Sequence, residues 1–104
     1  MKNPFDFSTL DILQSELDAI HEALIFQELD VTPHAEREAA AEKIPLLALL
    51  EAVLVGRPVS KDLPKNSLNR VAGINFEHQM DDRRWIRVKV AWVDGFFVIT
   101  VHTI

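Results

Sequence analysis

The sequence contains no cysteine and only three glycines among its 104 residues. The absence of cysteine excludes disulfides, thiolate metal ligands and cysteine nucleophiles, and it suits a reducing cytoplasm. Three glycines are too few to suggest a phosphate-binding glycine-rich loop. The longest apolar run, residues 44–50, falls far short of the roughly 20 residues of a membrane span. Residues 1–10 carry no apolar signal core. We therefore expect a cytoplasmic protein with no membrane segment.

The remaining composition is that of one folded domain. Hydrophobic residues make up 48% and charged residues 26% of the chain, which excludes disorder. The net charge of −5 argues against nucleic-acid binding by the whole surface. Charge is segregated, however: residues 1–55 hold 11 acids and 3 bases, whereas residues 56–104 hold 5 acids and 8 bases. If this segregation persists in space, one face could still attract an anion.

The first half of the sequence predicts helices. Ser8 followed by Asp11 has the spacing of a capping box and predicts a helix that runs to about Leu24. Residues 25–31 are ambiguous and could be an extended link. Thr32 before Pro33 predicts a second helix to about residue 43.

Proline then separates the second helix from a third. Pro45 interrupts the helical pattern, because proline lacks a backbone donor and disfavours helix in the residue before it. A third helix over residues 46–54 follows, with Gly56 as its cap. Residues 56–70 form a polar connection that is long for a compact domain, and such a segment is often functional or contains a strand.

From residue 71 the apolar residues alternate with period two, as in strands. Asp94-Gly95 predicts a hairpin with a two-residue loop, which places Val90 opposite Ile99. A three-residue loop over residues 81–83 gives the first hairpin its best pairing, with Glu77 beside Arg87. We therefore predict an α+β fold with N-terminal helices on one face of a C-terminal three- or four-stranded antiparallel sheet.

The outer face of this sheet is the first candidate site. Arg87 and Lys89 could bind a phosphodiester, and His102 could act as general acid or base with Glu77 orienting it. Trp85 shares the face and could stack on a base. The alternative is a solvated face whose opposite charges pair across strands. The histidines show no ligand spacing, so we expect no metal, and nothing indicates a cofactor.

His34 is the second candidate. It lies in the first turn of the helix that opens at Thr32-Pro33, where free backbone N–H groups can bind an anion. The alternative is an ordinary surface histidine.

The segment Thr32-Pro33-His34-Ala35 also resembles the helix start of a bacterial family of domains of unknown function. The similarity covers residues 31–104 and continues through Ile44, residues 49–56 and the strand pattern of residues 88–101. That family is grouped with RelE- and BrnT-like toxin domains.

The resemblance implies a RelE-like core over residues 31–104, preceded by a helical segment over residues 1–30. It also implies metal-independent ribonuclease activity, with His34 and the outer sheet face as the site. Glu38 and Glu42 stand where the family commonly has arginine.

Two alternatives to a ribonuclease stay open. The first is a catalytically inactive immunity- or antitoxin-like module, because acidic helices suit the neutralisation of a basic protein. The second is a homodimer assembled through residues 96–104, if that strand lies at an exposed edge. The expected partners are therefore RNA, an antitoxin or other protein, or a second copy.

Overall fold

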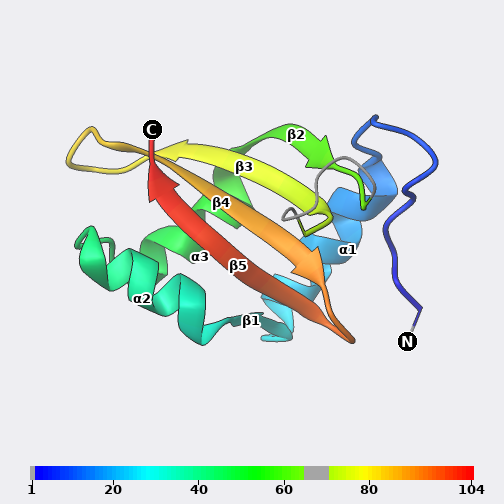
Figure 1. The fold of residues 1–104 in the computed structure, drawn as a ribbon, viewed down its shortest axis with the longest axis horizontal. Helices are drawn as coiled ribbons and strands as arrows, with labels where there is room; N and C mark the ends of the chain where they lie inside the picture. The colour runs from blue at the N-terminus through cyan, green and yellow to red at the C-terminus, as the bar shows by residue number, and fades with distance from the viewer. Residues whose placement is uncertain (1, 65–70) are drawn as a thin grey trace.

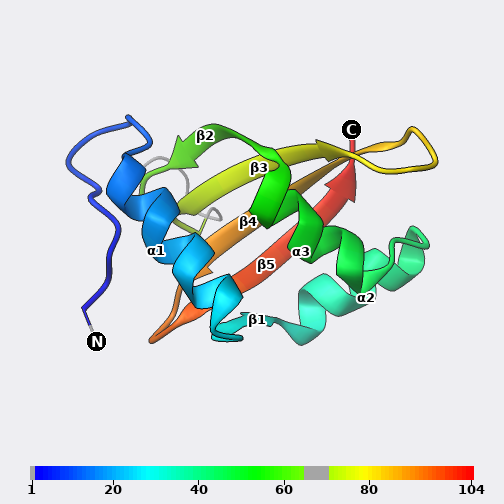
Figure 2. The same ribbon diagram turned by 180° about the vertical axis from the view of Figure 1, so that it is seen from behind.

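The computed structural model describes residues 2–64 and 71–104. In these ranges three helices cover one side of a five-stranded sheet, and the described helices leave the side that faces the viewer in Figure 1 uncovered (Figures 1 and 2). The elements in chain order are α1 (Gln14–Ile25), β1 (Leu29–Val31), α2 (Pro33–Ala41), α3 (Leu46–Val55), β2 (Arg57–Asp62), β3 (Gly73–Gln79), β4 (Trp85–Trp92) and β5 (Phe96–Thr103). The α+β class is confirmed.

The sheet is mixed rather than antiparallel. Its strand order is β1-β5-β4-β3-β2. Strands β2 to β5 are antiparallel neighbours, but β1 pairs with β5 in parallel, with Asp30 opposite Phe97. Since β1 lies between α1 and α2, the helices do not form one N-terminal block as predicted. Three residues are too few to show a period in the sequence, so β1 is defined only by its pairing with β5.

Helix α1 begins later than its sequence predicts. Its N-cap is Leu13 rather than Ser8, whose backbone N–H donates to the Asp6 carboxylate. The acid that satisfies the first turn is Glu16, which accepts a hydrogen bond from the Leu13 backbone N–H at 2.8 Å. Glu16 is buried and also holds Lys61 of β2 at 2.8 Å. Glu16 and Lys61 lie far apart in the sequence, so their contact could not be predicted from local patterns. This explains why the predicted start of α1 at Ser8 is wrong.

Helices α2 and α3 have the capping residues that the sequence predicts. The Thr32 hydroxyl accepts a hydrogen bond from the Ala35 N–H at 3.1 Å, as an N-cap should. Helix α3 ends at Gly56. A Cβ on Gly56 would lie 2.1 Å from the Ala52 carbonyl oxygen, so the close approach of backbone explains the glycine.

The two hairpins differ in how well their registers were predicted. In the first, Glu77 lies opposite Arg87 as expected for the three-residue loop. The second follows the predicted register from Ile86 to Lys89 only. A bulge then shifts it by one residue, so that Val90 faces Val98 rather than Ile99. The Asp94-Gly95 turn is accordingly part of a three-residue connection, and the predicted two-residue loop is wrong.

Strand β2 lies within the segment predicted as a polar connection. Its Lys61 faces the core opposite Ile74, whereas Ser60 faces outward opposite Asn75. Pro58 and the register shift next to it interrupt the alternation of inward- and outward-facing residues, so the sequence of this segment does not show the period of a strand. The remainder of the connection, residues 65–70, lies outside the described residues.

Candidate functional site: a groove on the outer face of the sheet

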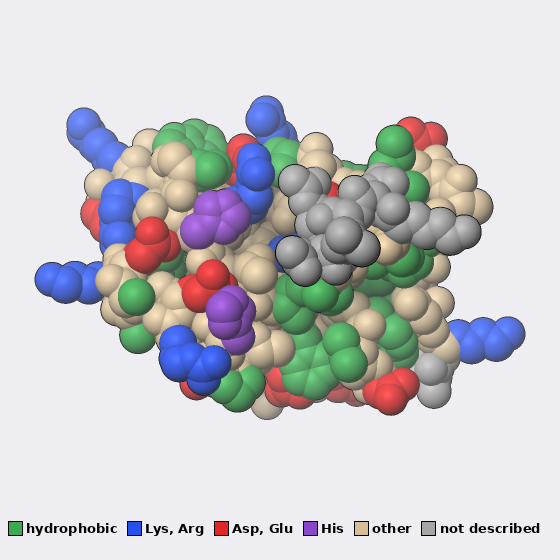
Figure 3. All heavy atoms as spheres, in the orientation of Figure 1, with side chains coloured by type: hydrophobic (Ala, Val, Ile, Leu, Met, Phe, Trp, Pro, Cys, Tyr) green, Lys and Arg blue, Asp and Glu red, His purple; other side chains and the backbone are tan. Residues whose placement is uncertain are grey.

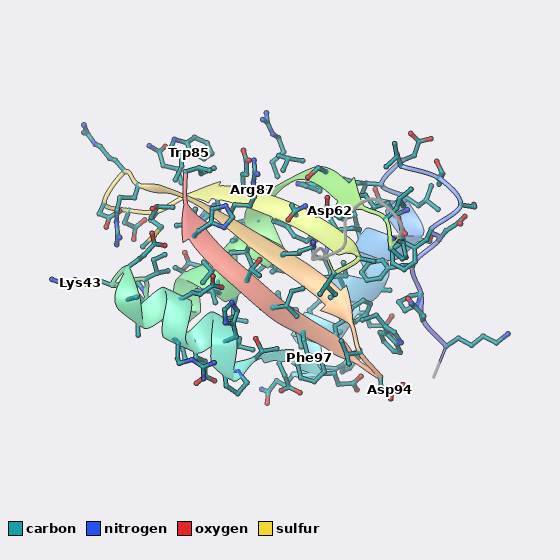
Figure 4. The ribbon with its side chains drawn as sticks, viewed as in Figure 1. Lys43, Asp62, Trp85, Arg87, Asp94 and Phe97 are labelled. Atoms are coloured by element: carbon teal, nitrogen blue, oxygen red, sulfur yellow. The ribbon has the colours of Figure 1, made fainter. Side chains whose placement is uncertain are left out.

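The outer face of the sheet carries a groove of about 440 Å³. Strands β2, β3, β4 and β5 all contribute side chains to it, because alternate residues of each strand point away from the helices. Figure 4 shows Trp85 at one end of this face, with Arg87 and Asp62 further along it. The described residues that line the groove are Ser60, Asp62, Val71, Asn75, Arg87, Lys89, Ile99, Thr100 and His102.

Arg87 is positioned by an ion pair with Glu77. The Arg87 Nε donates to Glu77 Oε2 at 3.0 Å, and Nη2 donates to the same oxygen. The Arg87 side chain is 38% exposed and Glu77 is 17% exposed. Among the described residues Nη1 has no hydrogen-bond partner, so its donors are available to a ligand in the groove. Glu77 therefore orients Arg87, rather than His102 as the sequence suggested.

Lys89 is held in a second, more buried ion pair. Its Nζ lies 2.8 Å from Asp62 Oδ2, and the Lys89 side chain is only 8% exposed. Asn75 donates to the same carboxylate oxygen at 2.9 Å and to the Ser60 hydroxyl at 3.0 Å. Asp62 thus neutralises much of the charge that Lys89 would offer to a phosphate.

His102 is exposed and lies directly opposite Arg87 in the β4–β5 ladder. The next outward-facing rung pairs Lys89 with Thr100. Directly opposed side chains of an antiparallel pair have Cβ atoms about 4.5–5.5 Å apart. An imidazole, a guanidinium and a hydroxyl are therefore gathered on one small area, as Figure 3 shows for the purple and blue side chains of this face.

His34 lies outside the groove, at the edge of β5. Its Nε2 is 3.4 Å from Glu38 Oε1, and its side chain is 62% exposed. The same carboxylate oxygen accepts the backbone N–H of Val101 at 3.1 Å. Because Val101 precedes His102, Glu38 brings the two histidines to the same edge of the sheet, although His34 does not line the groove.

Glu42 continues this pattern one turn along α2. Its carboxylate accepts the backbone N–H of Thr103 at 3.1 Å and the Thr103 hydroxyl at 2.9 Å. Together, Glu38 and Glu42 satisfy edge donors of β5 that β1 is too short to reach. These contacts occupy the Val101 and Thr103 N–H groups at the β5 edge, and the homodimer through residues 96–104 stays a prediction.

The remaining predicted residue, Trp85, lies on the outer face but beyond the groove, and it is 47% exposed. Sequence reasoning missed Ser60 and Asp62, because their strand was treated as a connection. The alternation of Ser60, Lys61 and Asp62 is the one signal that could have revealed them.

Comparison with protein-family models, with curated proteins and with solved structures finds no match to this chain. No group of three or more histidine, aspartate or glutamate side chains in the described ranges could hold a metal ion. None of the helices in residues 2–64 and 71–104 is long and apolar enough to cross a membrane.

Proposed function

We propose that the outer-face groove binds RNA and cleaves it without a metal ion. The observation that carries this proposal is the placement of His102 opposite Arg87, with Thr100 and Lys89 on the adjacent rung. RNA supplies its own nucleophile, the ribose 2′-hydroxyl, so the protein needs only a base, an acid and cationic support.

In this proposal His102 removes the proton from the 2′-hydroxyl as a general base. The 2′-oxygen attacks the adjacent phosphorus, the bond to the 5′-oxygen breaks, and the products are a 2′,3′-cyclic phosphate and a 5′-hydroxyl. The leaving 5′-oxygen takes up a proton, for which His34 is the candidate donor at the same edge. Arg87 stabilises the charge that develops on the phosphate through its free Nη1.

The ion pairs of the groove limit its affinity for a polyanion. Glu77 and Asp62 lie beside the two cations, and the chain as a whole is acidic. We therefore expect weak binding with only a shallow dependence on salt concentration, because few counterions are released from the RNA.

The test is incubation of the purified protein with labelled RNA in EDTA, beside His102→Ala, Arg87→Ala and His34→Ala. Arg37→Ala is the matched control for the arginine, because Arg37 is exposed on α2. Loss of cleavage in the His102 and Arg87 variants but not in the control supports the proposal. If both of these variants still cleave RNA, the active residues lie elsewhere. Intact RNA that also fails to bind wild-type protein at low salt refutes the ribonuclease.

The second candidate is a non-catalytic module that binds a basic protein. The observation in its favour is that all three described helices lie within the acid-rich residues 1–55 and cover the side of the sheet away from the groove (Figure 2). Its surface would therefore be distinct from the outer-face groove.

A further inference from the structure

A second groove, of about 630 Å³, lies at the opposite end of the fold from the β3–β4 hairpin. It is bounded by the residues that precede α1, the last turn of α1, β1 and the tip of the β4–β5 hairpin. Figure 4 shows Asp94 and Phe97 at this tip. The side chains on which the argument depends are Phe26, Trp92, Phe97, Glu28, Asp30 and Asp94. None of them belongs to the outer-face groove.

Aromatic rings form a rigid wall of this second groove. Phe96 is 5% exposed and packs edge-on against Trp92, with ring centroids 5.1 Å apart and an interplanar angle of 80°. Phe5 holds the other side of Phe96 at 5.7 Å. Trp92 is thus fixed in place while it lines the groove. Phe26, at the end of α1, also lines the groove. It is 65% exposed, so packing in the hydrophobic core does not account for an aromatic residue at this position.

Carboxylates surround these rings. Glu22, Glu28, Asp30 and Asp94 all line the groove and are exposed, and their side chains have no hydrogen-bond or ion-pair partner among the described residues. Lys2 is the one basic side chain among the described lining residues. The parallel pairing of β1 with β5 sets Asp30 directly opposite Phe97, so a carboxylate lies beside an aromatic ring. Figure 3 shows acidic side chains along the lower edge of the molecule, next to hydrophobic ones.

We propose that this aromatic, acidic groove binds the cationic side chains of a basic peptide segment, and that arginine fits it best. A guanidinium or ammonium group is attracted to an aromatic face within about 6 Å of the ring centroid. The surrounding carboxylates add Coulomb attraction and hydrogen-bond acceptors, and arginine presents a planar set of donors to them. The volume lies in the range of about 300–1,000 Å³ that is usual for ligand sites.

Two other occupants fit the groove less well. A metal ion requires convergent ligands, and the described carboxylates form no such cluster. A second copy of this chain carries a net charge of −5, so the two copies repel each other overall, whereas a basic peptide is attracted. The proposal does not depend on the ribonuclease, and it gives the second candidate function a defined surface.

Trp92 provides a direct readout. The chain has two tryptophans, and Trp85 lies on the outer face of the sheet, so Trp85→Phe leaves Trp92 as the sole fluorophore. The probe is an acetylated and amidated hexa-arginine peptide, titrated at low and at high salt. A hexa-glutamate peptide of the same length is the negative control. We expect a saturable change in Trp92 emission with hexa-arginine only, and weaker binding at high salt.

The decisive variant is Glu28→Gln combined with Asp30→Asn, in the Trp85→Phe background. It removes two charges at the groove, and we expect the Kd for hexa-arginine to rise about tenfold. Glu36→Gln combined with Asp81→Asn removes the same charge from exposed positions outside the groove and should change the Kd by less than about twofold. Phe26→Ala should also weaken binding, by about threefold, because it removes one aromatic face.

Each result decides for or against the groove once circular dichroism shows that the variants are folded. A tenfold effect at the groove with little effect in the control supports the proposal. Equal weakening by both double variants would show that net charge alone attracts the peptide, which overturns it. Unchanged Trp92 emission at low salt overturns it as well. The RNA-cleavage assay is unaffected by any of these outcomes.

Discussion

The buried ion pair between Glu16 and Lys61 is expected to be a principal determinant of stability. Both side chains are completely buried, and Lys61 Nζ makes three contacts. It lies 2.8 Å from Glu16 Oε2, and it donates to the backbone carbonyls of Asp6 at 2.7 Å and Asp11 at 2.9 Å. The pair therefore joins the segment before α1 to the edge strand β2.

Lys61→Met tests this role, because methionine keeps most of the volume and removes the charge. The substitution leaves the Glu16 carboxylate buried without its cation and removes the donor to two carbonyls. Breaking a buried pair in this way costs about 3–5 kcal/mol of unfolding free energy. Since the total free energy of unfolding of a small domain is about 5–15 kcal/mol, the variant should be only marginally stable.

Urea unfolding followed by circular dichroism measures the loss. With an m value of about 1.5 kcal/mol per molar urea, the midpoint should fall by roughly 2–3 M. Lys43→Met is the matched control, because Lys43 is exposed and points away from the body of the protein (Figure 4). It should change the free energy of unfolding by less than about 0.5 kcal/mol.

A double-mutant cycle separates the pair from its surroundings. Glu16→Gln removes the negative charge, and its single side-chain oxygen can accept from only one of the backbone N–H groups of Asp6 and Leu13, which now donate to different carboxylate oxygens. The double variant Glu16→Gln with Lys61→Met should be more stable than the sum of the single losses predicts, because no lone charge stays buried. A Lys61→Met loss below about 1 kcal/mol, or strict additivity, would refute the reasoning.

Three further perturbations test other contacts of the fold. Glu42→Ala leaves the Thr103 N–H and hydroxyl without their acceptor, so the free energy of unfolding should fall by about 1–3 kcal/mol in urea titrations; an unchanged midpoint would contradict the edge-covering role. Arg84 N–H and Nε donate to Asp82 and hold the pKa of that carboxyl below its usual 3.8. Arg84→Met should raise the pKa of Asp82 toward 3.8 in an NMR titration. A folded-state pKa below the unfolded-state value stabilises the protein at pH values above the unfolded-state pKa. The wild type should therefore lose this stabilisation as the pH falls through the folded-state pKa of Asp82. Gly95 has a φ of +145°, so Gly95→Ala should cost about 1–3 kcal/mol, and a thermal melt that is no lower than the wild type's would refute the strain.

Much of the candidate site follows from the alternation of the strands. Arg87, Lys89 and His102 were placed on one face because a period of two sends them all away from the apolar residues between them. The three-residue loop set Glu77 beside Arg87, and the structure has this register. What the sequence could not supply is the partner of Lys89 and the contacts of Glu38. Asp62, which pairs with Lys89, comes from a strand whose alternation is interrupted next to Pro58, and Glu38 of α2 contacts His34 and the Val101 backbone N–H.

The sequence by itself determined the elements whose signals are local. Thr32-Pro33 started α2, Gly56 ended α3, and the apolar alternation defined β3 to β5, because capping and periodicity act over a few residues. Only the tertiary structure decided the features that join distant segments: the parallel strand β1, the bulge that shifts β5, the start of α1 at the Glu16–Lys61 pair, and the two grooves. The physical reason is that each of these depends on a hydrogen bond, an ion pair or a packing contact between residues far apart in the chain, and no local pattern encodes such a contact.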